Sequence, residues 1–565
     1  MTAACASAAC RDPPPRRPKT YAHNSRLSRA GIECRPGLAD SGRHTLAMSA
    51  PPPLEAPLGP AASAPARTHW SAQPGWVLGA WAAWLLCTLW VRPLMLPDEG
   101  RYAWVGWEMW LGDGLLPTLD GLPYFHKPPL TYWIGMAGLS LFGPVPAALR
   151  LAPAFGAWLM GTGLWLAVRR WHGPRSAGIA LLALATNPLV FIGAQYINHD
   201  MLIAGMITLA VLGWARAFEV LGQPALRWLV AGWIACGLGF LSKGLIGAVL
   251  PLLTVGLWLL VQRRWADVVR LAHPVAVLAG VAVALPWMLA MQQRHPGFFD
   301  YFIIEQHFRR FSGVGFNNPQ PFWFYCAVLP ALTLPWALWT PALLRRWRDH
   351  ATAPTPQRTF TLLCLCWLVV VLLFFSLPRS KLVGYILPAV PAWIALLALG
   401  AAPSRRWPLA AAAGAVLCLS ALVATFAVQA PKSNADTARA LKQLASPADS
   451  VVFVDAMFFD IALYAELRRP VLVAGNWNDP DLPRADNWRK ELLDAARFDT
   501  AGGRAQLWPL ARLNDLTCRG VTTWLVVDSV RSSAVQAVPG AERVHRGVNS
   551  DLWRAPARDC AGAQH

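Results

Sequence analysis

The sequence predicts an α-helical polytopic membrane protein with a small α/β domain at its C-terminal end. Of its 565 residues, 55% are hydrophobic and only 14% are charged, whereas soluble proteins average about 25% charged residues. Apolar runs of roughly 18–22 residues recur along most of the chain, and runs of that length can cross a hydrocarbon core ~30 Å thick. A soluble fold would have to bury many helices that lack a polar face, so we exclude it.

The apolar runs predict about 11–13 transmembrane helices. The run after Trp76 is too long for a signal peptide and lacks a convincing cleavage site, so we interpret it as an uncleaved first helix. Eleven helices are expected, at about 75–96, 147–168, 176–194, 201–219, 228–242, 244–261, 272–290, 322–344, 359–377, 382–399 and 407–428.

The formal net charge of +19 is explained by membrane topology and does not indicate nucleic-acid binding. With the N-terminus inside, each basic cluster between apolar runs falls on the cytoplasmic side, as the positive-inside rule requires. The 30 Trp residues fit the aromatic belts of the membrane interfaces. The basic clusters contain Arg169, Arg170, Arg175, Arg227, Arg263, Arg264, Arg345, Arg346, Arg348, Arg405 and Arg406.

Three regions are expected along the chain. Residues 1–70 are rich in Pro, Ala, Ser and Arg and are expected to be disordered, with Met48 as an alternative start. Residues 75–430 form the membrane-embedded domain. Residues 431–565 are expected outside the membrane as a small α/β domain, because they contain three strand-like segments: Val451–Val454, Val471–Ala474 and Trp524–Val527.

This last region also holds two of the 11 cysteines, Cys518 and Cys560. A disulfide between them is expected if the region lies in an oxidising compartment.

Charged residues on the outward face are the features that call for a functional explanation. For any single one of them, snorkelling or interfacial pairing is an adequate account. As a group, however, the outward bases oppose the usual charge bias, which indicates an anionic partner such as a lipid phosphate. The bases are Arg101, Lys127, Lys243, Arg309, Arg310, Arg379 and Lys381, with His307 in the second outward loop and Asp200 at the end of the third outward hairpin.

An acidic pair, Asp98-Glu99, opens the first outward loop directly after the first helix. A carboxylate beside a cationic site can act as general base on an acceptor hydroxyl or phosphate. The alternative is a salt bridge to Arg101 or Arg310. Both interpretations hold if Glu99 is structural and Asp98 is catalytic.

The loop motifs resemble those of a known family. An apolar helix is followed by Asp-Glu-x-Arg-Tyr (98–102) and then by Gly-Leu-Pro-Tyr-Phe-x-Lys-Pro-Pro-Leu-x-Tyr-Trp (121–133). This pattern is similar to the bacterial aminoarabinose (lipid A) transferases, which belong with the protein O-mannosyltransferases among the GT-C membrane glycosyltransferases. The resemblance extends over about residues 75–430. It includes Ser242-Lys243-Gly244, His307 and Ser380-Lys381-Leu382 with Tyr385.

The resemblance implies a sugar donor carried on a polyprenyl phosphate, typically undecaprenyl phosphate. Asp98 would be the general base, with Glu99 in support. The donor phosphate would be held by Arg101, Lys127 and Arg310, with Lys243 and Lys381 as further candidates. Tyr102, Tyr124, Asp200 and Tyr385 would contact or support the substrate.

One residue departs from the family pattern. The family has Glu before the motif lysine, whereas this chain has His126. The resemblance implies either metal-independent chemistry or a single divalent ion. Imidazole suits Zn²⁺, so His126 and His307 are the candidate metal ligands.

We therefore predict an enzyme of the bacterial inner membrane whose active site faces the periplasm. It would transfer a sugar, aminoarabinose or a related pentose or hexose, from a polyprenyl-phosphate donor to lipid A, another envelope glycan or a protein. Two alternatives stay open, a transporter or flippase of lipid-linked sugars and a non-catalytic membrane subunit. Transporters tend to show internal repeats and mid-membrane charges, and the sequence displays neither.

Overall fold

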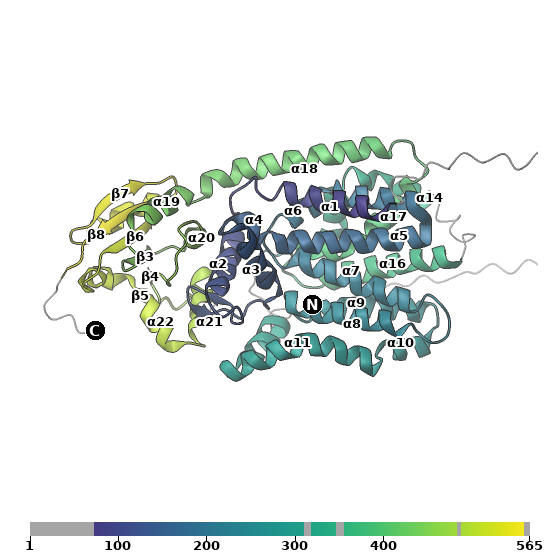
Figure 1. Ribbon diagram of the computed structural model, residues 1–565, viewed down its shortest axis with the longest axis horizontal. Helices are drawn as coiled ribbons and strands as arrows, with labels where there is room; N and C mark the ends of the chain where they lie inside the picture. Colours follow the sequence, from purple (N-terminus) through teal and green to yellow (C-terminus); the bar gives the residue numbers. More distant parts are fainter. Residues whose placement is uncertain (1–72, 310–317, 346–354, 483–486, 559–565) are drawn as a thin grey trace, which may run out of the picture. The chain divides into compact units, whose positions relative to one another are not determined.

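The computed structural model describes residues 73–309, 318–345, 355–482 and 487–558 (Figure 1). The expectation for residues 1–70 falls outside the described residues, as do those for Arg310 and Cys560. The boundary expected at 430/431 stays a prediction.

Every one of the eleven predicted segments contains a helix. They are α1 (Pro74–Cys87), α5 (Leu151–Ala185), α6 (Pro188–Ala194), α7 (Asp200–Ala217), α8 (Leu226–Lys243), α9 (Ile246–Val261), α11 (Pro274–Arg294), α13 (Phe324–Leu332) with η3 (Trp336–Trp339) and α14 (Thr340–Arg345), α16 (Thr355–Ser376), η4 (Val383–Ala389) with α17 (Val390–Ala401), and α18 (Trp407–Gln429). Short elements α10 (Trp265–Leu271), η2 (Asp300–Arg309) and η5 (Ala430–Lys432) connect them.

Fewer helices than the predicted eleven to thirteen are long and apolar enough to cross a membrane unaided. Among the described residues there are six, or seven if the bent pair Phe324–Leu332 and Trp336–Arg345 is one span. Three further apolar helices, α1, α9 and α3 (Leu130–Phe142), are shorter. The fold class predicted from the sequence, a multi-pass helical membrane protein, is confirmed.

The break expected between helices 147–168 and 176–194 is present, because the backbone of α5 is non-helical at Gly173 (φ 85°), just before Pro174. Glycine adopts this conformation without a Cβ clash. The first helix was expected to reach residue 96 but ends at Cys87, and Pro93 and Pro97, which lack an N–H, do not support a helix beyond it.

The first outward loop is an ordered unit. It comprises α2 (Asp98–Leu111), a hairpin of β1 (Thr118–Leu119) and β2 (Leu122–Pro123), then α3 and α4 (Pro146–Leu149). The turn residues Asp120 and Gly121 have φ of 55° and 72°, as expected for an Asp-Gly hairpin turn. The buried Asp120 Oδ1 accepts a hydrogen bond from the backbone N–H of Val471 (2.7 Å), so the hairpin tip is anchored to the C-terminal region.

The C-terminal region contains the predicted sheet. Its six strands are ordered β5-β4-β3-β6-β8-β7, with β5, β4, β3 and β6 parallel and β8 and β7 antiparallel. The three predicted strands are confirmed as β3 (Ser450–Val454), β4 (Leu472–Gly475) and β6 (Thr523–Asp528). The others are β5 (Leu507–Pro509), β7 (Glu542–Arg546) and β8 (Ser550–Ala555), with α19 (Ala435–Leu444), α20 (Ile461–Tyr464), α21 (Trp488–Ala496), α22 (Thr500–Gln506), η7 (Leu510–Cys518) and η8 (Ser529–Val535).

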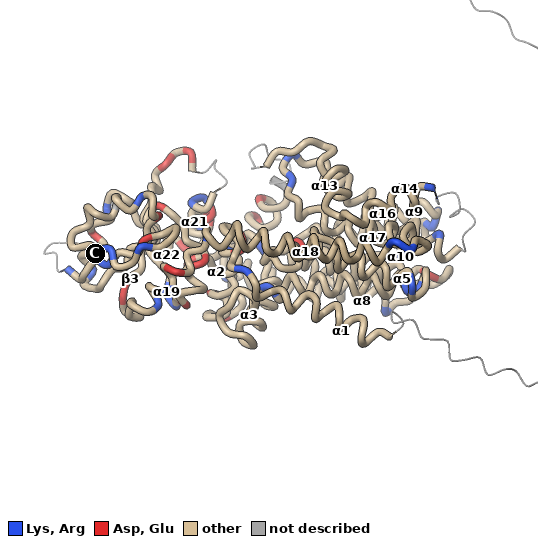
Figure 2. Tube along the Cα trace, turned by 90° about the horizontal axis from the view of Figure 1, so that it is seen from above, with Lys and Arg blue, Asp and Glu red and all other residues tan. Residues whose placement is uncertain are grey.

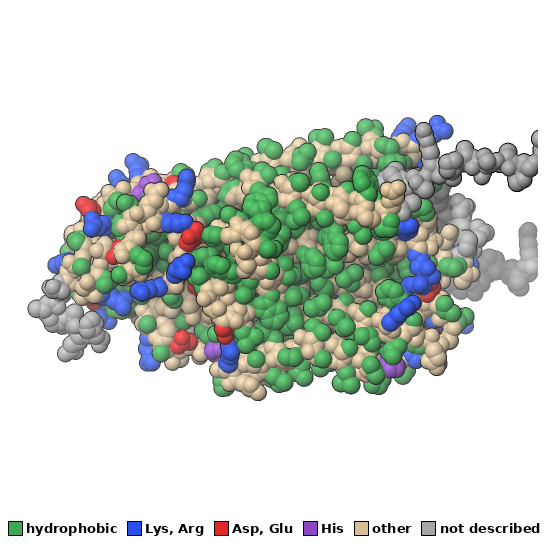
Figure 3. All heavy atoms as spheres, in the orientation of Figure 1, with side chains coloured by type: hydrophobic (Ala, Val, Ile, Leu, Met, Phe, Trp, Pro, Cys, Tyr) green, Lys and Arg blue, Asp and Glu red, His purple; other side chains and the backbone are tan. Residues whose placement is uncertain are grey.

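Charge and apolar surface are distributed as the membrane reading requires. Lys and Arg lie mainly at the two ends of the view, where α5, α10 and α14 are labelled and in the C-terminal sheet region (Figure 2). Hydrophobic side chains dominate the middle of the face shown in Figure 3, and charged ones lie toward its two ends.

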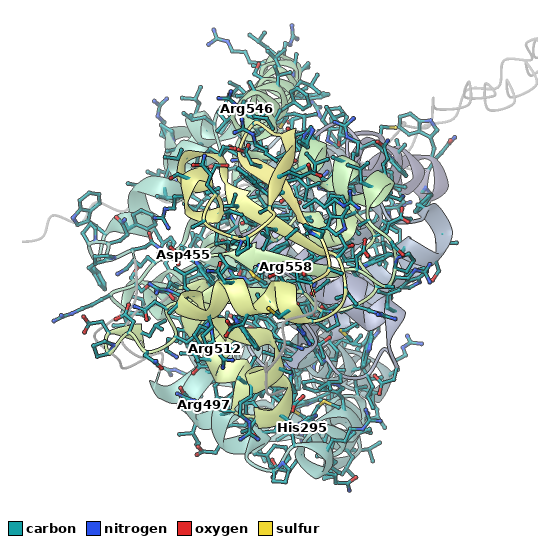
Figure 4. All side chains as sticks on the ribbon, turned by 90° about the vertical axis from the view of Figure 1, so that its left-hand side faces the viewer. His295, Asp455, Arg497, Arg512, Arg546 and Arg558 are labelled. Carbon is teal, nitrogen blue, oxygen red and sulfur yellow. The ribbon has the colours of Figure 1, made fainter. Side chains whose placement is uncertain are left out.

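Aromatic rings join the second outward loop to the C-terminal sheet region. Phe125 contacts Phe298 and Phe498 edge to face, each with ring centroids 4.8 Å apart. Tyr301 lies 5.4 Å from Phe498. His295, whose ring is 6.4 Å from that of Phe498, lies at the edge of this region (Figure 4). These contacts fix the position of the motif residues that follow Phe125.

Replacing Asp120 by Asn should stabilise the protein at neutral and alkaline pH. Burial raises the pKa of Asp120 well above its usual value, and the neighbouring Glu108 adds to the shift. A carboxyl with a raised pKa in the folded state loses stability as pH rises above its unfolded pKa of about 3.9. Asn keeps the acceptor for Val471 and removes the charge. At pH 8 we expect a melting temperature roughly 2–4 °C higher, corresponding to about 1 kcal/mol.

The gain should shrink on lowering the pH to about 3, below the unfolded pKa, where the wild-type carboxyl is mostly protonated in both states. Thermal unfolding followed by tryptophan fluorescence at the two pH values measures it. Equal melting temperatures of Asp120→Asn and wild type at pH 8 would contradict the assigned effect.

Candidate active site

Asp98 is the first residue of α2, and its carboxylate is partly exposed to solvent. Its side chain is 50% exposed and forms an ion pair with Arg101, three residues later. Its Oδ2 accepts a hydrogen bond from the Tyr196 hydroxyl (3.3 Å). A carboxylate in the first helical turn is stabilised by the helix dipole. Asp98 is therefore held in place by Arg101 and Tyr196 yet is accessible to a second reactant.

Glu99, the next residue, has a different environment. It is fully buried between Arg92 (2.6 Å) and Arg150 (2.8 Å), and it accepts the backbone N–H groups of Met95 (2.7 Å) and Ile197 (3.1 Å). Burial raises the pKa of Glu99, but Arg150 and Arg92 outweigh this effect and lower it to about 2. Glu99 is thus a structural carboxylate that fixes the start of α2.

Arg101 is shared between two carboxylates. It forms ion pairs with Asp98 and with Glu491 of α21, and its guanidinium lies over the rings of Tyr102 (5.4 Å) and Phe459 (6.0 Å). Its predicted role on a donor phosphate stays a prediction. The structure assigns it a further task, because it links the first outward loop to the C-terminal sheet region.

Lys127 follows the hairpin in the stretch fixed by Phe125. Its Nζ donates to the His126 carbonyl (3.1 Å). Its charge contributes to lowering the pKa of both His199 and His307, after the larger effect of burial. Lys127 therefore lies within electrostatic reach of His199 at the start of α7 and of His307 in the second outward loop, two residues that are far apart in the sequence.

Asp200 and Lys243 form an ion pair between the start of α7 and the end of α8. The Lys243 ammonium lies 4.5 Å from the ring centroid of Tyr385. Gly384 permits this approach, since a Cβ there would lie 2.9 Å from Asp200 Oδ2. These three predicted site residues are brought together, and Lys243 has a carboxylate partner already.

His307 packs on the glycine of the Ser-Lys-Gly motif. Gly244 has φ of 89°, and a Cβ there would lie 1.9 Å from His307 Nε2. His307 Nδ1 bonds to the Phe302 carbonyl (2.6 Å), and its Nε2 accepts the N–H of Leu245 (3.2 Å). Both ring nitrogens are occupied, so this geometry does not favour the predicted metal role.

The other candidate metal ligand, His126, stacks on Tyr124 with ring centroids 4.7 Å apart. Within the described ranges, no group of three or more His, Cys, Asp or Glu side chains is placed to hold a metal ion. The metal expectation therefore rests on the sequence resemblance alone.

Lys381 is placed as a structural residue rather than a phosphate ligand. It is only 3% exposed, and its ammonium donates to the carbonyls of Gln320 (3.0 Å) and Pro378. Its backbone N–H bonds to Asn318 (3.2 Å). These contacts tie two outward loops together and leave the ammonium little capacity for a ligand.

Sequence reasoning missed two residues of this site, His199 and Glu491. His199 precedes the predicted Asp200, is 1% exposed, and has both ring nitrogens buried without a hydrogen-bond partner among the described residues. The signal that could have identified His199 is its position directly before Asp200, which the sequence had singled out. Glu491 lies 390 residues beyond Arg101, and no local pattern marks it.

Comparison with known proteins adds to this geometry. Residues 126–289 match the family model described as dolichyl-phosphate-mannose-protein mannosyltransferase. The chain is 34% identical over 321 residues to undecaprenyl phosphate-alpha-4-amino-4-deoxy-L-arabinose arabinosyl transferase 2 of Pseudomonas fluorescens, covering 56% of this chain and 53% of that one. A like-named protein of Aeromonas hydrophila is 34% identical over 315 residues, covering 55% and 56%.

Solved structures of ArnT from Cupriavidus metallidurans match most of the chain. The apo structure has a TM-score of 0.70 at 23% identity and covers 86% of this chain and 99% of its own. The structure titled as bound to undecaprenyl phosphate has a TM-score of 0.73 at 24% identity and covers 88% and 100%. This chain has the aminoarabinose transferase fold.

The resemblance stated from the first-loop motifs is confirmed by these matches. In sequence, the chain spans about half the length of the curated relatives it matches. The match to the family model begins at His126 and ends at Leu289. It therefore includes Lys127, Asp200 and Lys243 but not Asp98.

Glu99→Gln should destabilise the protein strongly, because it leaves the buried Arg92 and Arg150 without a counter-charge. Breaking a buried ion pair from one side costs about 3–5 kcal/mol. We expect a large fall in melting temperature or in the yield of monodisperse protein in detergent. The matched control is Asp98→Asn, since Asp98 is half exposed and its removal should cost less than about 1 kcal/mol. Equal stability of the two variants would contradict the structural role of Glu99.

Proposed function

We propose that this chain is a membrane glycosyltransferase that transfers a sugar from a polyprenyl-phosphate donor to an acceptor of the bacterial envelope. The observation that carries the proposal is the half-exposed Asp98 carboxylate at the start of α2, in the same ordered loop as Lys127. The named relatives support the donor class, since they are called undecaprenyl phosphate-aminoarabinose transferases.

In the proposed reaction, Asp98 removes the proton from an acceptor hydroxyl or phosphate. The acceptor oxygen then attacks the anomeric carbon of the sugar, and the bond from that carbon to the donor phosphate oxygen breaks. The lipid phosphate leaves with the electron pair, and cationic side chains stabilise its charge. Lys127 is the candidate for that task, because it follows the hairpin in the same ordered loop as Asp98.

We propose aminoarabinose or a related sugar as the transferred group and lipid A as the first acceptor to test. The site is proposed to face the periplasm of the inner membrane. Cys518 in the C-terminal region is disulfide-bonded, which suits an oxidising compartment. The basic clusters at the opposite end suit the cytoplasmic side.

Asp98→Asn should abolish most sugar transfer, because the general base is lost while the fold is kept. General-base catalysis contributes typically 10²–10⁴-fold, so kcat should fall at least about 100-fold. The assay uses purified full-length protein with undecaprenyl-phosphate-linked aminoarabinose and lipid A, with mass spectrometry of the product. Asp113→Asn is the matched control, since Asp113 is an exposed acid of the same loop paired with Arg294 (2.6 Å). Full activity of Asp98→Asn would remove Asp98 from catalysis.

Lys127→Ala should weaken binding of undecaprenyl phosphate, because one charged contact to the phosphate is lost. A hydrogen bond to a charged group contributes about 1.5–3 kcal/mol, equivalent to roughly 10–150-fold in affinity. Lys381→Ala is the comparison: it should lower stability and leave the affinity unchanged, since Lys381 binds backbone carbonyls. If Lys381→Ala weakened binding and Lys127→Ala did not, the phosphate site would lie elsewhere.

A further inference from the structure

A group of buried polar atoms that have no hydrogen-bond partner among the described residues lies where the start of α7 meets α2 and α3 of the first outward loop. His199 precedes α7 and is 1% exposed, and Tyr132 in the first turn of α3 is also 1% exposed. Within the described part of the chain, neither ring nitrogen of His199 makes a hydrogen bond, and the Tyr132 hydroxyl makes none either. Thr131 Oγ1, one residue earlier, is in the same condition.

The rings of this group contact one another. His199 lies edge to face on Tyr102, with centroids 4.9 Å apart, and on Tyr132, at 5.3 Å. Tyr102 comes from α2, four residues after Asp98. The group therefore joins α2, which begins with Asp98, α7, which begins with Asp200, and α3, which begins three residues after Lys127.

The energetics of burial indicate that these atoms serve a ligand. A buried donor or acceptor without a partner costs about 1–3 kcal/mol, and most such groups in native structures are hydrogen-bonded. Here the contacting rings of His199 and Tyr132 carry three such atoms, and Thr131 Oγ1 in the same helical turn as Tyr132 is a fourth. A ligand that supplies hydrogen bonds recovers this cost on binding.

The charge state of His199 determines which chemical group of a ligand can pair with it. Burial lowers the pKa of His199 well below its usual value, and the charges of Lys127 and Lys243 lower it further. The imidazole is therefore neutral at physiological pH and presents one N–H donor and one nitrogen acceptor. A hydroxyl group has the matching donor and acceptor, whereas a phosphate offers acceptors and negative charge that the lysine ammonium groups suit better.

We propose that His199 and Tyr132 form a subsite that hydrogen-bonds a hydroxyl group of the donor sugar. The subsite lies within electrostatic reach of Lys127, the lysine assigned to the phosphate, so a sugar directly bonded to that phosphate reaches it. The ring of Tyr102 is a wall of the same subsite. This inference rests on the proposed function and specifies which residues read the sugar.

The test compares binding of two ligands to full-length protein, undecaprenyl phosphate and undecaprenyl-phosphate-linked aminoarabinose. His199→Phe keeps a flat ring against Tyr102 and Tyr132 and removes both nitrogens. We expect its affinity for the sugar-linked lipid to fall about 10-fold or more, the effect of one or two hydrogen bonds. Its affinity for undecaprenyl phosphate should stay within about 2-fold of wild type.

Two further variants complete the experiment. Tyr132→Phe removes a single hydroxyl oxygen and should show the same selective loss at smaller amplitude, even if His199→Phe folds poorly. The matched control is His273→Phe, because His273 also precedes a helix and has a buried ring nitrogen without a partner in the described structure. It lies between α10 and α11, and both affinities should be unchanged.

The outcomes separate this inference from the proposed function. If His199→Phe lowered the affinity for both ligands equally, the sugar subsite would be overturned. The same holds if neither His199→Phe nor Tyr132→Phe changed either affinity. Both outcomes would leave the proposed phosphate site unaffected. Failure of the wild-type protein to bind either lipid would overturn the proposed function, and the subsite with it.

Discussion

The contact of Glu99 with Arg92 and Arg150 is the interaction on which the site depends. Two guanidinium groups and two backbone N–H groups converge on one buried carboxylate. Arg150 also donates to the carbonyls of Leu89 and Arg92 (both 2.8 Å). The chain between α1 and α2 is thereby held against the start of α5. Because α2 begins at this point, the cluster sets the direction of the helix that presents Asp98.

The C-terminal sheet region contacts the first outward loop and holds its residues in position. The hairpin turn at Asp120 is bonded to Val471, and Arg101 is paired with Glu491 of α21. Phe498 packs on Phe125, two residues before Lys127. Each motif residue of the first loop is therefore within a few positions of a contact to this region. Changes in the C-terminal sheet are expected to act on the site through these contacts.

The sequence was sufficient for the membrane fold, the strands of the tail and the importance of the first loop, because hydropathy, positive-inside charge and the Asp98 to Lys127 motifs are local signals. It could not separate Lys127 from Lys381, since both are bases on the outward face and only three-dimensional contacts show that Lys381 binds backbone carbonyls. The pairing of Arg101 with Glu491 spans 390 residues. His199 was hidden because a lone histidine in an apolar setting is usually a core residue.

The most direct test of the central claim, that donor phosphate lies beside Lys127 within reach of the Asp98 loop, is an experimental structure of the full chain with undecaprenyl phosphate. The account predicts phosphate density in contact with the Lys127 ammonium, on the same side of Tyr102 as His199, with Glu99 still enclosed by Arg92 and Arg150. Phosphate density at Lys381, or at any position that does not contact Lys127, would contradict the account.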